Sequence, residues 1–485
     1  MSLNKNHHPR ELSVDNYTGY AGLPPLAGLH SMNDAIGHGL AVSESVKRLK
    51  RLHWSLRRLH QIFVSRITSM PIYELKMAFS LHAHYCVEHV GEFAARVKEM
   101  RQPPHGLDVS PHESLDTFFD EILCTPSVEA LLLGIYDHAV PAVIRALENL
   151  MADTNKLFDH PTWRICRLAH VELTDVKQYG LEAMRCLVSD EKRTALQEWL
   201  STLNSLLAAA GDLDGKQEPS EEFVARHFSA VPYRYDPVPR RDERFLDPYN
   251  MGVNAEAMLF NPDIQPLPKT IMLFFKRMRE IDVPEMMASI LAENGDKPWE
   301  YTRDMTRQLW DEARHAMMGE IGFVHLGIDW SQIPFNFTWS LGLNTNLSSK
   351  ERHAVLYTIE QGLMPKTTGK EYEWEIAIAA ADPLAGMIQD YDWADEVLHA
   401  RIGRKWIVPE IGSQSEAMAY GDTAWSKILT DWKKWKDDGL TEHRNWWPDV
   451  YRAACRHWNI TPDPELLRYD VSYENTRADL KAIVG

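Results

Sequence analysis

The first half of the chain has the alternation of apolar and polar positions that is typical of long amphipathic helices. From Asp34 to about Ala208 apolar residues recur every three or four positions, and between Leu40 and Ile67 Lys and Arg occupy the opposite face. The pattern predicts long helices over about 40–67, 71–100, 127–153 and 160–188, and a shorter one over 191–207. Strand-like alternation is scarce. Residues 34–208 are therefore predicted to form a four-helix bundle.

The second half repeats this pattern after an interruption. Residues 209–266 are rich in Pro, Tyr and charge, which predicts a connection with little regular structure. Helical periodicity returns over about 267–293, 298–326, from 349 onwards and 384–407. We therefore expect a second four-helix bundle over 267–408, and we expect residues 1–33, rich in Pro, Gly, His and Asn, to form a tail. The predicted fold class is all-α, with two tandem four-helix bundles.

The C-terminal region, residues 409–485, is helical in part and unusually rich in tryptophan. Repeated Trp at helical spacing more often packs against a core than takes part in chemistry. We therefore expect this region to be a brace docked on a bundle, with these side chains in the contact: Trp425, Trp432, Trp435, Trp446, Trp447 and Trp458.

Two short motifs of the same form stand in the second half. Residues 311–315 and 395–399 both read DExxH. Because positions i and i+3 share a face of a helix, Glu312 points the same way as His315, and Glu396 the same way as His399. Bundles that bind two metal ions use one Glu-x-x-His on each of two helices and one Glu on each of the other two. The alternative is that both motifs are solvated helical faces.

The remaining two carboxylates of this pattern have several candidates. Glu360 is the candidate on the third helix, with Glu371, Glu373 and Glu375 as alternatives. On the first helix the candidates are Glu280 and Glu285. If the first two helices are antiparallel about a turn near residue 295, Glu312 lies about 21 Å into its helix at 1.5 Å per residue, and Glu280 lies at a similar distance from the turn. We therefore choose Glu280 and keep Glu285 open.

The aspartates that begin the two motifs have a second expected role. Asp311 and Asp395 are expected to hydrogen-bond to the ligand imidazoles and hold their orientation, as carboxylates beside metal-bound histidines do. Their alternative is a surface position without such a partner. The chemistry of a redox metal pair favours this residue set, because hard carboxylate oxygens hold and charge-balance two cations while imidazoles complete the coordination.

The two halves resemble each other beyond their helical pattern. Residues 81–92 can be laid on residues 309–320, since both begin with Leu and end in Gly-Glu. The same kind of alignment places the third and fourth helices of one half on those of the other. The first half then lacks metal-binding residue types at most aligned positions, which are His84, Val87, Tyr136, His170 and Leu173. We therefore expect only the C-terminal bundle to bind metal.

The composition of the chain excludes several classes of function. The chain has 52 Lys and Arg against 69 Asp and Glu, a net charge of -17, which argues against a nucleic-acid binder with a basic face. Five cysteines without a CxxC pair indicate reduced thiols and a cytoplasmic location. No signal peptide or membrane-spanning stretch is expected. The motifs of nucleotide-dependent enzymes, serine hydrolases and zinc peptidases are absent from the sequence.

At Asp311–His315 the sequence resembles the ferritin-like diiron-carboxylate superfamily, which includes ribonucleotide reductase small subunits, acyl-carrier-protein desaturases and bacterial multicomponent monooxygenases. The resemblance covers about 267–407, with a degenerate copy over 38–188. It implies ferritin-like bundles, two iron ions (or iron and manganese) and dioxygen as co-substrate. Carried over by position, the metal-binding and catalytic residues would be Glu280, Glu312, His315, Glu360, Glu396 and His399.

The chain departs from these relatives in its second bundle, its Trp-rich region and two prolines, Pro284 and Pro365, that follow candidate ligands. We therefore expect a non-haem diiron oxidase or monooxygenase acting on a small organic substrate by hydroxylation, desaturation, N-oxygenation or oxidative cleavage. An external electron donor is expected because no flavin or nicotinamide motif is present, and a homodimer is compatible with the sequence. Two alternatives stay open, an iron-handling ferroxidase and a non-catalytic ferritin-like scaffold.

Overall fold

The computed structural model of the protein describes residues 12–220, 224–247, 249–250, 252–335, 338–429, 434–435, 437–441 and 444–472. In this part of the chain the regular structure is helical, and the only β-type pairing is one isolated bridge between Val253 and Ser472. The prediction of an all-α protein is confirmed. The arrangement as two tandem four-helix bundles stays a prediction, as do the domain boundaries.

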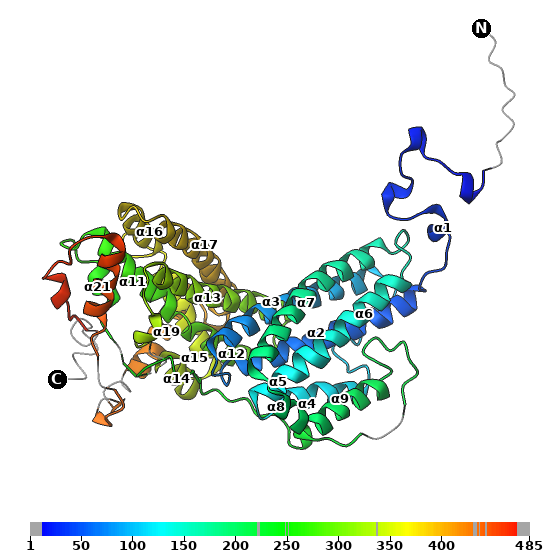
Figure 1. The fold of residues 1–485 in the computed structure, drawn as a ribbon, viewed down its shortest axis with the longest axis horizontal. Coiled ribbons are helices and arrows are strands. Elements are labelled where there is room, and N and C mark those ends of the chain that lie inside the picture. Colours follow the sequence, from blue (N-terminus) through cyan, green and yellow to red (C-terminus); the bar gives the residue numbers. More distant parts are fainter. Residues whose placement is uncertain are drawn as a thin grey trace, which may run out of the picture. The chain divides into compact units, whose positions relative to one another are not determined.

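The chain divides into two compact units, and helices α2 and α3 contribute residues to both. Unit 1 comprises Met1–Leu59 and Tyr85–Tyr233, and unit 2 comprises His60–His84 and Arg234–Gly485. The helices in the first half are α1 (Met32–Ala35), α2 (Val42–Ile67), α3 (Tyr73–Glu99), α4 (Glu113–Leu123), α5 (Val128–Leu132), the π-helix η4 (Leu133–Ala139), α6 (Val140–Asp153), α7 (His160–Leu187), α8 (Asp190–Ala195) and α9 (Gln197–Ala209) (Figure 1).

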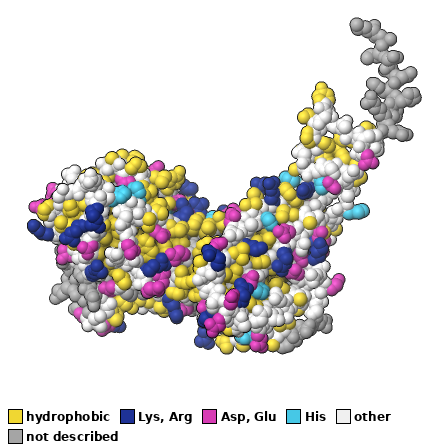
Figure 2. All heavy atoms as spheres, viewed as in Figure 1, with side chains coloured by type: hydrophobic (Ala, Val, Ile, Leu, Met, Phe, Trp, Pro, Cys, Tyr) yellow, Lys and Arg dark blue, Asp and Glu magenta, His cyan; other side chains and the backbone are white. Residues whose placement is uncertain are grey.

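One helical stretch of unit 1 is apolar on most of its surface. Among the described residues, Val128–Asp153 alone is long and apolar enough to cross a membrane, and 83% of its most apolar window is buried inside the protein. Such a high buried fraction is typical of a helix in the core of a protein. On the face drawn in Figure 2, the Lys and Arg side chains of the described residues are interspersed with Asp and Glu.

Unit 2 carries the segment with the DExxH motifs. Its helices are α10 (Ala255–Leu259), α11 (Pro266–Arg279), α12 (Asp282–Glu293), α13 (Trp299–His325), α14 (Thr338–Asn346), α15 (Ser349–Gly362), α16 (Lys370–Ala379), α17 (Pro383–Trp406), α18 (Val408–Ile411), α19 (Gln414–Leu429) and α21 (Trp447–Trp458). Helix α13 packs against α11, α12 and α17, and α15 packs against α12, α17 and α19. Helices α11, α13, α16 and α17 can be followed together in Figure 1.

Glycine permits the closest of these helix contacts. A Cβ on Gly319 of α13 would lie 2.2 Å from the backbone nitrogen of Met278 in α11. A Cβ on Gly403 of α17 would lie 2.4 Å from the ring of Tyr357 in α15. Side chains at these two positions would therefore push the helices apart. The short separation brings the functional side chains of neighbouring helices within reach of one another.

Two prolines interrupt helices that the periodicity predicts as longer. The helix expected over 267–293 is broken at Glu280 into α11 and α12, where Glu280 has φ -67° and ψ 0°. In a continuous helix the ring of Pro284 would collide with the carbonyl of Glu280, four residues earlier, and proline has no N–H to donate to that carbonyl. Pro365 likewise follows the end of α15, and the chain resumes as α16 at Lys370.

Three of the described tryptophans of the C-terminal region show how it packs within unit 2. Trp446 and Trp447 are fully buried in its apolar core, with the ring centroid of Trp446 4.7 Å from that of Phe275. Trp425 of α19 instead stands with Trp339, their ring centroids 4.5 Å apart. Trp432 lies outside the described residues.

Candidate metal centre

The structure brings the six predicted ligands together in unit 2. They come from the break after α11 (Glu280), from α13 (Glu312, His315), from α15 (Glu360) and from α17 (Glu396, His399). The side chains form two groups that share Glu396. Within each group the ligand atoms all lie within 4.8 Å of one another. Group A is Glu280, His315, Asp392 and Glu396, and group B is Glu312, Glu360, Glu396 and His399. The protein is thus an all-helical protein with two buried carboxylate and histidine groups that can hold metal ions.

Each of the six predicted ligands presents a buried atom that makes no hydrogen bond. These atoms are Glu280 Oε2, Glu312 Oε1, His315 Nδ1, Glu360 Oε2, Glu396 Oε2 and His399 Nδ1. They lie close to one another, since His315 Nδ1 is 3.2 Å from Glu280 Oε2 and His399 Nδ1 is 3.1 Å from Glu312 Oε1. A buried polar atom without a partner is costly, and a set of them from carboxylates and imidazoles is the donor set of a divalent transition metal. The residues present therefore fit a pair of metal ions.

The other nitrogen of each imidazole faces the aspartate of the opposite motif. His315 Nε2 lies 3.2 Å from Asp395 Oδ2, and His399 Nε2 lies 3.4 Å from Asp311 Oδ2. Arg314 contacts both aspartates, at 2.8 Å in the case of Asp395. Burial would raise the pKa of Asp311, but its hydrogen bonds to His399 and Arg314 hold that pKa well below its usual range. Both aspartates are placed to fix the imidazole orientation, with Nδ1 turned towards the groups.

Charge is unevenly compensated within group B. Burial, together with the negative charges of Glu396 and Glu312, raises the pKa of Glu360 well above its ordinary value. Burial also acts to raise the pKa of Glu312, but the close imidazoles of His315 and His399 lower it to about 2. The amide of Gln308 donates a hydrogen bond to Glu360 Oε1 at 3.0 Å. Divalent cations would supply the missing positive charge in place of protons.

Burial would lower the pKa of both imidazoles, but their carboxylate neighbours outweigh it. The pKa of His315 is raised well above its ordinary value by the charge of Asp392, by Asp395 beside Nε2, and by Glu280 and Glu312 beside Nδ1. The pKa of His399 is raised similarly by Asp311, Glu312 and Glu396. Metal binding would therefore release protons from both rings.

The alternative carboxylates lie in other networks. Glu285 contacts Lys76 and Arg241 and accepts a hydrogen bond from Ser340 at 2.7 Å, all within unit 2. Glu373 pairs with Lys276. Of the two first-helix candidates, Glu280 is therefore the one that joins a metal-competent group.

Three residues at this centre were not predicted from the sequence. Asp392 belongs to group A, and it could have been found because it lies one helical turn before Glu396 on the same face. Lys370 and Arg277 both contact Asp392 from other helices. Sequence carries no signal for these two cations, because only the packing of α11 and α16 on α17 brings them there.

The aligned residues of the first half have other partners. In unit 1, His89 of α3 lies 2.7 Å from Glu172 and 2.9 Å from Glu92. His170 pairs with Glu148 at 3.0 Å. Tyr136 is fully buried in the π-helix η4. The prediction that this half binds no metal stays a prediction.

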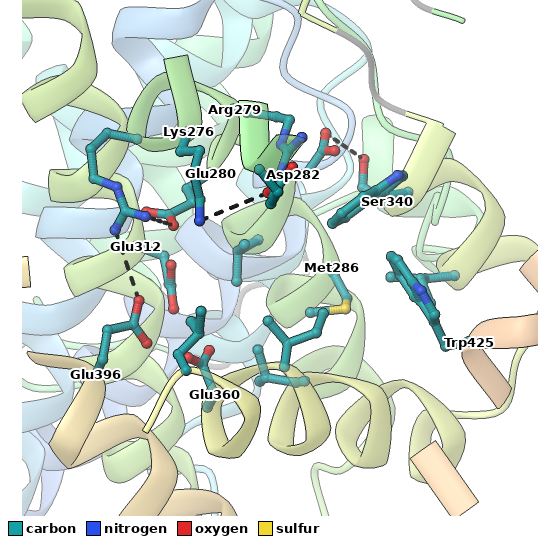
Figure 3. Close-up of a pocket in the computed structure, with 18 of the residues that line it drawn as sticks. Lys276, Arg279, Glu280, Asp282, Met286, Glu312, Ser340, Glu360, Glu396 and Trp425 are labelled. Atoms are coloured by element: carbon teal, nitrogen blue, oxygen red, sulfur yellow. Dashed lines mark hydrogen bonds and ion pairs between the residues drawn. The ribbon is translucent and has the colours of Figure 1, made fainter. Parts of the chain in front are cut away.

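A cavity of about 380 Å³ opens from these carboxylates. At one end the side chains of Glu312, Glu360 and Glu396 converge, and Trp425 stands at the other end with Met286 between them (Figure 3). Most of the intervening wall is apolar and is formed by Val283, Met286, Leu343, Leu356, Ile359 and Leu363. A mostly apolar cavity of this size with a few convergent polar groups is typical of a small-molecule site. The Trp-rich region thus contributes Trp425 to the cavity, which the sequence did not predict.

Comparison of the chain with protein-family models, with curated proteins and with solved structures gives no match. The interpretation of this centre therefore rests on the geometry of the described residues, above all on the buried ligand atoms that face one another.

Proposed function

We propose that the protein is a non-haem diiron (or iron–manganese) oxidase or monooxygenase that uses dioxygen on a small organic substrate. Its metal ligands and catalytic residues are Glu280, Glu312, His315, Glu360, Glu396 and His399. The observation that carries the proposal is that these side chains, from four separate parts of the chain, bring carboxylate oxygens and imidazole nitrogens together in two buried groups that share Glu396.

The side chains around the metals have separate tasks. When bound, the two metal ions supply dioxygen binding and oxidising power. Asp311 and Asp395 hold the two imidazoles so that Nδ1 faces the metals. The apolar cavity wall holds the substrate beside the carboxylates and limits the access of water.

The cavity favours a substrate with a substantial apolar part, because its wall between Glu360 and Trp425 is mostly aliphatic and aromatic. The reaction is a hydroxylation, desaturation, N-oxygenation or oxidative cleavage. A hydroxylation inserts one oxygen atom of dioxygen into a C–H bond and releases the other as water. It takes two electrons and two protons from an external donor. We propose a cytoplasmic setting, with neither nucleic acid nor membrane as a partner, and a homodimer as a compatible assembly.

Iron reconstitution tests this function. Metal-free protein is loaded anaerobically with ferrous iron, the bound iron is counted, and the sample is then mixed with dioxygen. We expect about two irons per chain and a transient optical absorption. The double variant E312Q/H315Q, which removes one ligand from each group, should bind less than one iron. Uptake of many irons would indicate a storage protein, and no uptake by folded wild-type protein would indicate a scaffold.

A further inference from the structure

Lys370 places a positive charge inside group A. It is the first residue of α16, and its side chain is fully buried. Its Nζ lies 2.9 Å from Asp392 Oδ2, 3.0 Å from Glu396 Oε1 and 3.9 Å from Glu280 Oε1. Three of the four members of group A thus lie around one ammonium group. Lys370 therefore occupies a position in which a metal ion would meet a like charge.

Arg277 adds to this charge on the same side. It contacts Asp392, and its Nη2 lies 2.9 Å from Glu280 Oε1. Group A is therefore largely charge-compensated before any metal binds.

Group B has less of this compensation. In the described part of the chain no Lys or Arg nitrogen lies within 4 Å of a carboxylate oxygen of Glu312 or Glu360. The shared Glu396 contacts Lys370 at 3.0 Å and Arg277 at 4.0 Å. A divalent ion entering group B meets two carboxylates, Glu312 and Glu360, that have no lysine or arginine beside them, whereas one entering group A meets an ammonium and a guanidinium. Between buried charges only a few ångströms apart this difference is large.

Another carboxylate, on the same helix, lies within reach of the Lys370 side chain. Glu373 stands three residues later on α16, on the same face, and its buried Oε2 makes no hydrogen bond. A lysine has a flexible four-carbon stem, so its ammonium group can move where a guanidinium held by several contacts does not. The ammonium can therefore leave Asp392 and Glu396 and still pair with a carboxylate, that of Glu373, which also contacts Lys276 and Arg277.

We propose that Lys370 serves as a built-in cation of group A, so that the protein binds its two metal ions in order: the first in group B, and the second in group A only as Lys370 moves from Asp392 and Glu396 towards Glu373. This inference rests on the proposed dimetal function. It defines a one-metal form of the protein with group B filled, and it makes Lys370 the residue that sets how readily the second position fills.

Stepwise binding of manganese(II) to the metal-free full chain tests the proposal. Calorimetry gives the two affinities, and electron paramagnetic resonance counts free and bound manganese. We expect the second ion to bind at least about tenfold more weakly than the first. K370M, which keeps the stem and removes the charge, should bring the second affinity to within about threefold of the first. K370R keeps the charge and is the matched control, and it should retain the wild-type gap.

D392N provides an independent variant should K370M fold poorly. It removes a ligand of group A alone and should abolish the second binding event while the first stays within about threefold of wild type. Equal affinity of both ions in the wild type, or an unchanged gap in K370M, would overturn the role of Lys370. Failure of folded wild-type protein to bind any manganese would overturn the dimetal function itself, so the two failures are distinguishable.

Discussion

The carboxylate of Asp311 lies 3.4 Å from Nε2 of His399, so the aspartate of one DExxH motif holds the histidine of the other. The reverse pairing, His315 with Asp395, is 3.2 Å long. The two motifs are therefore interlocked across α13 and α17. The position of each imidazole depends on a residue some eighty positions away in the chain, as well as on its own helix.

This interlocking predicts the effect of removing one charge. D311N keeps the size of the side chain but can offer its amide to Nε2 and so favour the wrong tautomer of His399. We expect D311N to weaken metal binding by about 10–100-fold, the usual effect of losing a carboxylate behind a metal-bound imidazole. Metal titration of the purified protein measures it. The control is D390N, an exposed aspartate on α17, which should bind metal as wild type does. If D311N bound metal as tightly as the wild type, the contact between Asp311 and His399 would have no role in metal binding.

A pair of substitutions separates Glu280 from Glu285. We expect E280Q to lose the metal of group A while the fold persists. E285Q should keep its metals and lose roughly 3–5 kcal/mol of unfolding free energy, because it leaves buried Lys76 and Arg241 short of a negative partner. Metal content and denaturant unfolding measure the two effects. The opposite pattern, with metal lost only in E285Q, would return Glu285 to the ligand set.

Filling the cavity should block ligand access without removing the metals. Leu343 of α14 is buried, lines the cavity and is not one of the predicted metal ligands. We expect L343W to weaken binding of a small apolar fluorescent probe by at least about tenfold and to cost roughly 1–3 kcal/mol through overpacking, with the metal content unchanged. Fluorescence titration measures the first effect. V324W, at an exposed site on α13, is the control. Probe binding that is equally strong in both variants would place the ligand site elsewhere.

The His89 network of unit 1 predicts a pH-dependent stability. Burial lowers the pKa of His89, but hydrogen bonds to Glu172 and Glu92 outweigh it and raise the pKa to about 9. A histidine whose pKa is raised in the folded state stabilises the protein below its ordinary pKa of 6.5, and this contribution is lost as the pH rises through about 9.

H89Q should therefore lower the free energy of unfolding by roughly 2 kcal/mol at pH 6 and have little effect at pH 10. Thermal unfolding of the metal-free chain at both pH values measures this, with H105Q, an exposed histidine of the same unit, as the control. A loss of the same size at both pH values would show that His89 stabilises by packing alone.

Part of the candidate site could be predicted from the spacing of residues along single helices. The side chains of Glu312 and His315 share a helical face whatever the tertiary structure, and so do those of Glu396 and His399. The helix lengths on either side of the turn near residue 295 favoured Glu280 over Glu285 by simple arithmetic. The break of the first helix at Glu280 could not be placed to the residue, although Pro284 stands four positions later. In the structure Glu280 belongs to a group that could hold a metal, and Glu285 pairs with Lys76 and Arg241.

Other parts of the site had no local signal. Lys370 begins a short helix after a proline-terminated one, and nothing in residues 366–372 shows that its ammonium lies beside Asp392. Trp425 carried the pattern of a packing residue and lines the cavity instead. Each of these positions depends on how far one helix is shifted along its neighbour, which the period of apolar residues leaves undetermined.

The sequence by itself determined that the protein is helical and which residues share each helical face, because hydrophobic periodicity and the i,i+3 geometry of a helix are local properties. The tertiary structure alone decided that Glu396 is shared by two groups, that the two DExxH motifs hold each other's histidines, and that Lys370 stands in one group and not the other. The physical reason is packing. Close approaches such as that of Gly319 to Met278 set how far each helix is shifted along its neighbour. Only that relative shift brings ligands from different helices to one point.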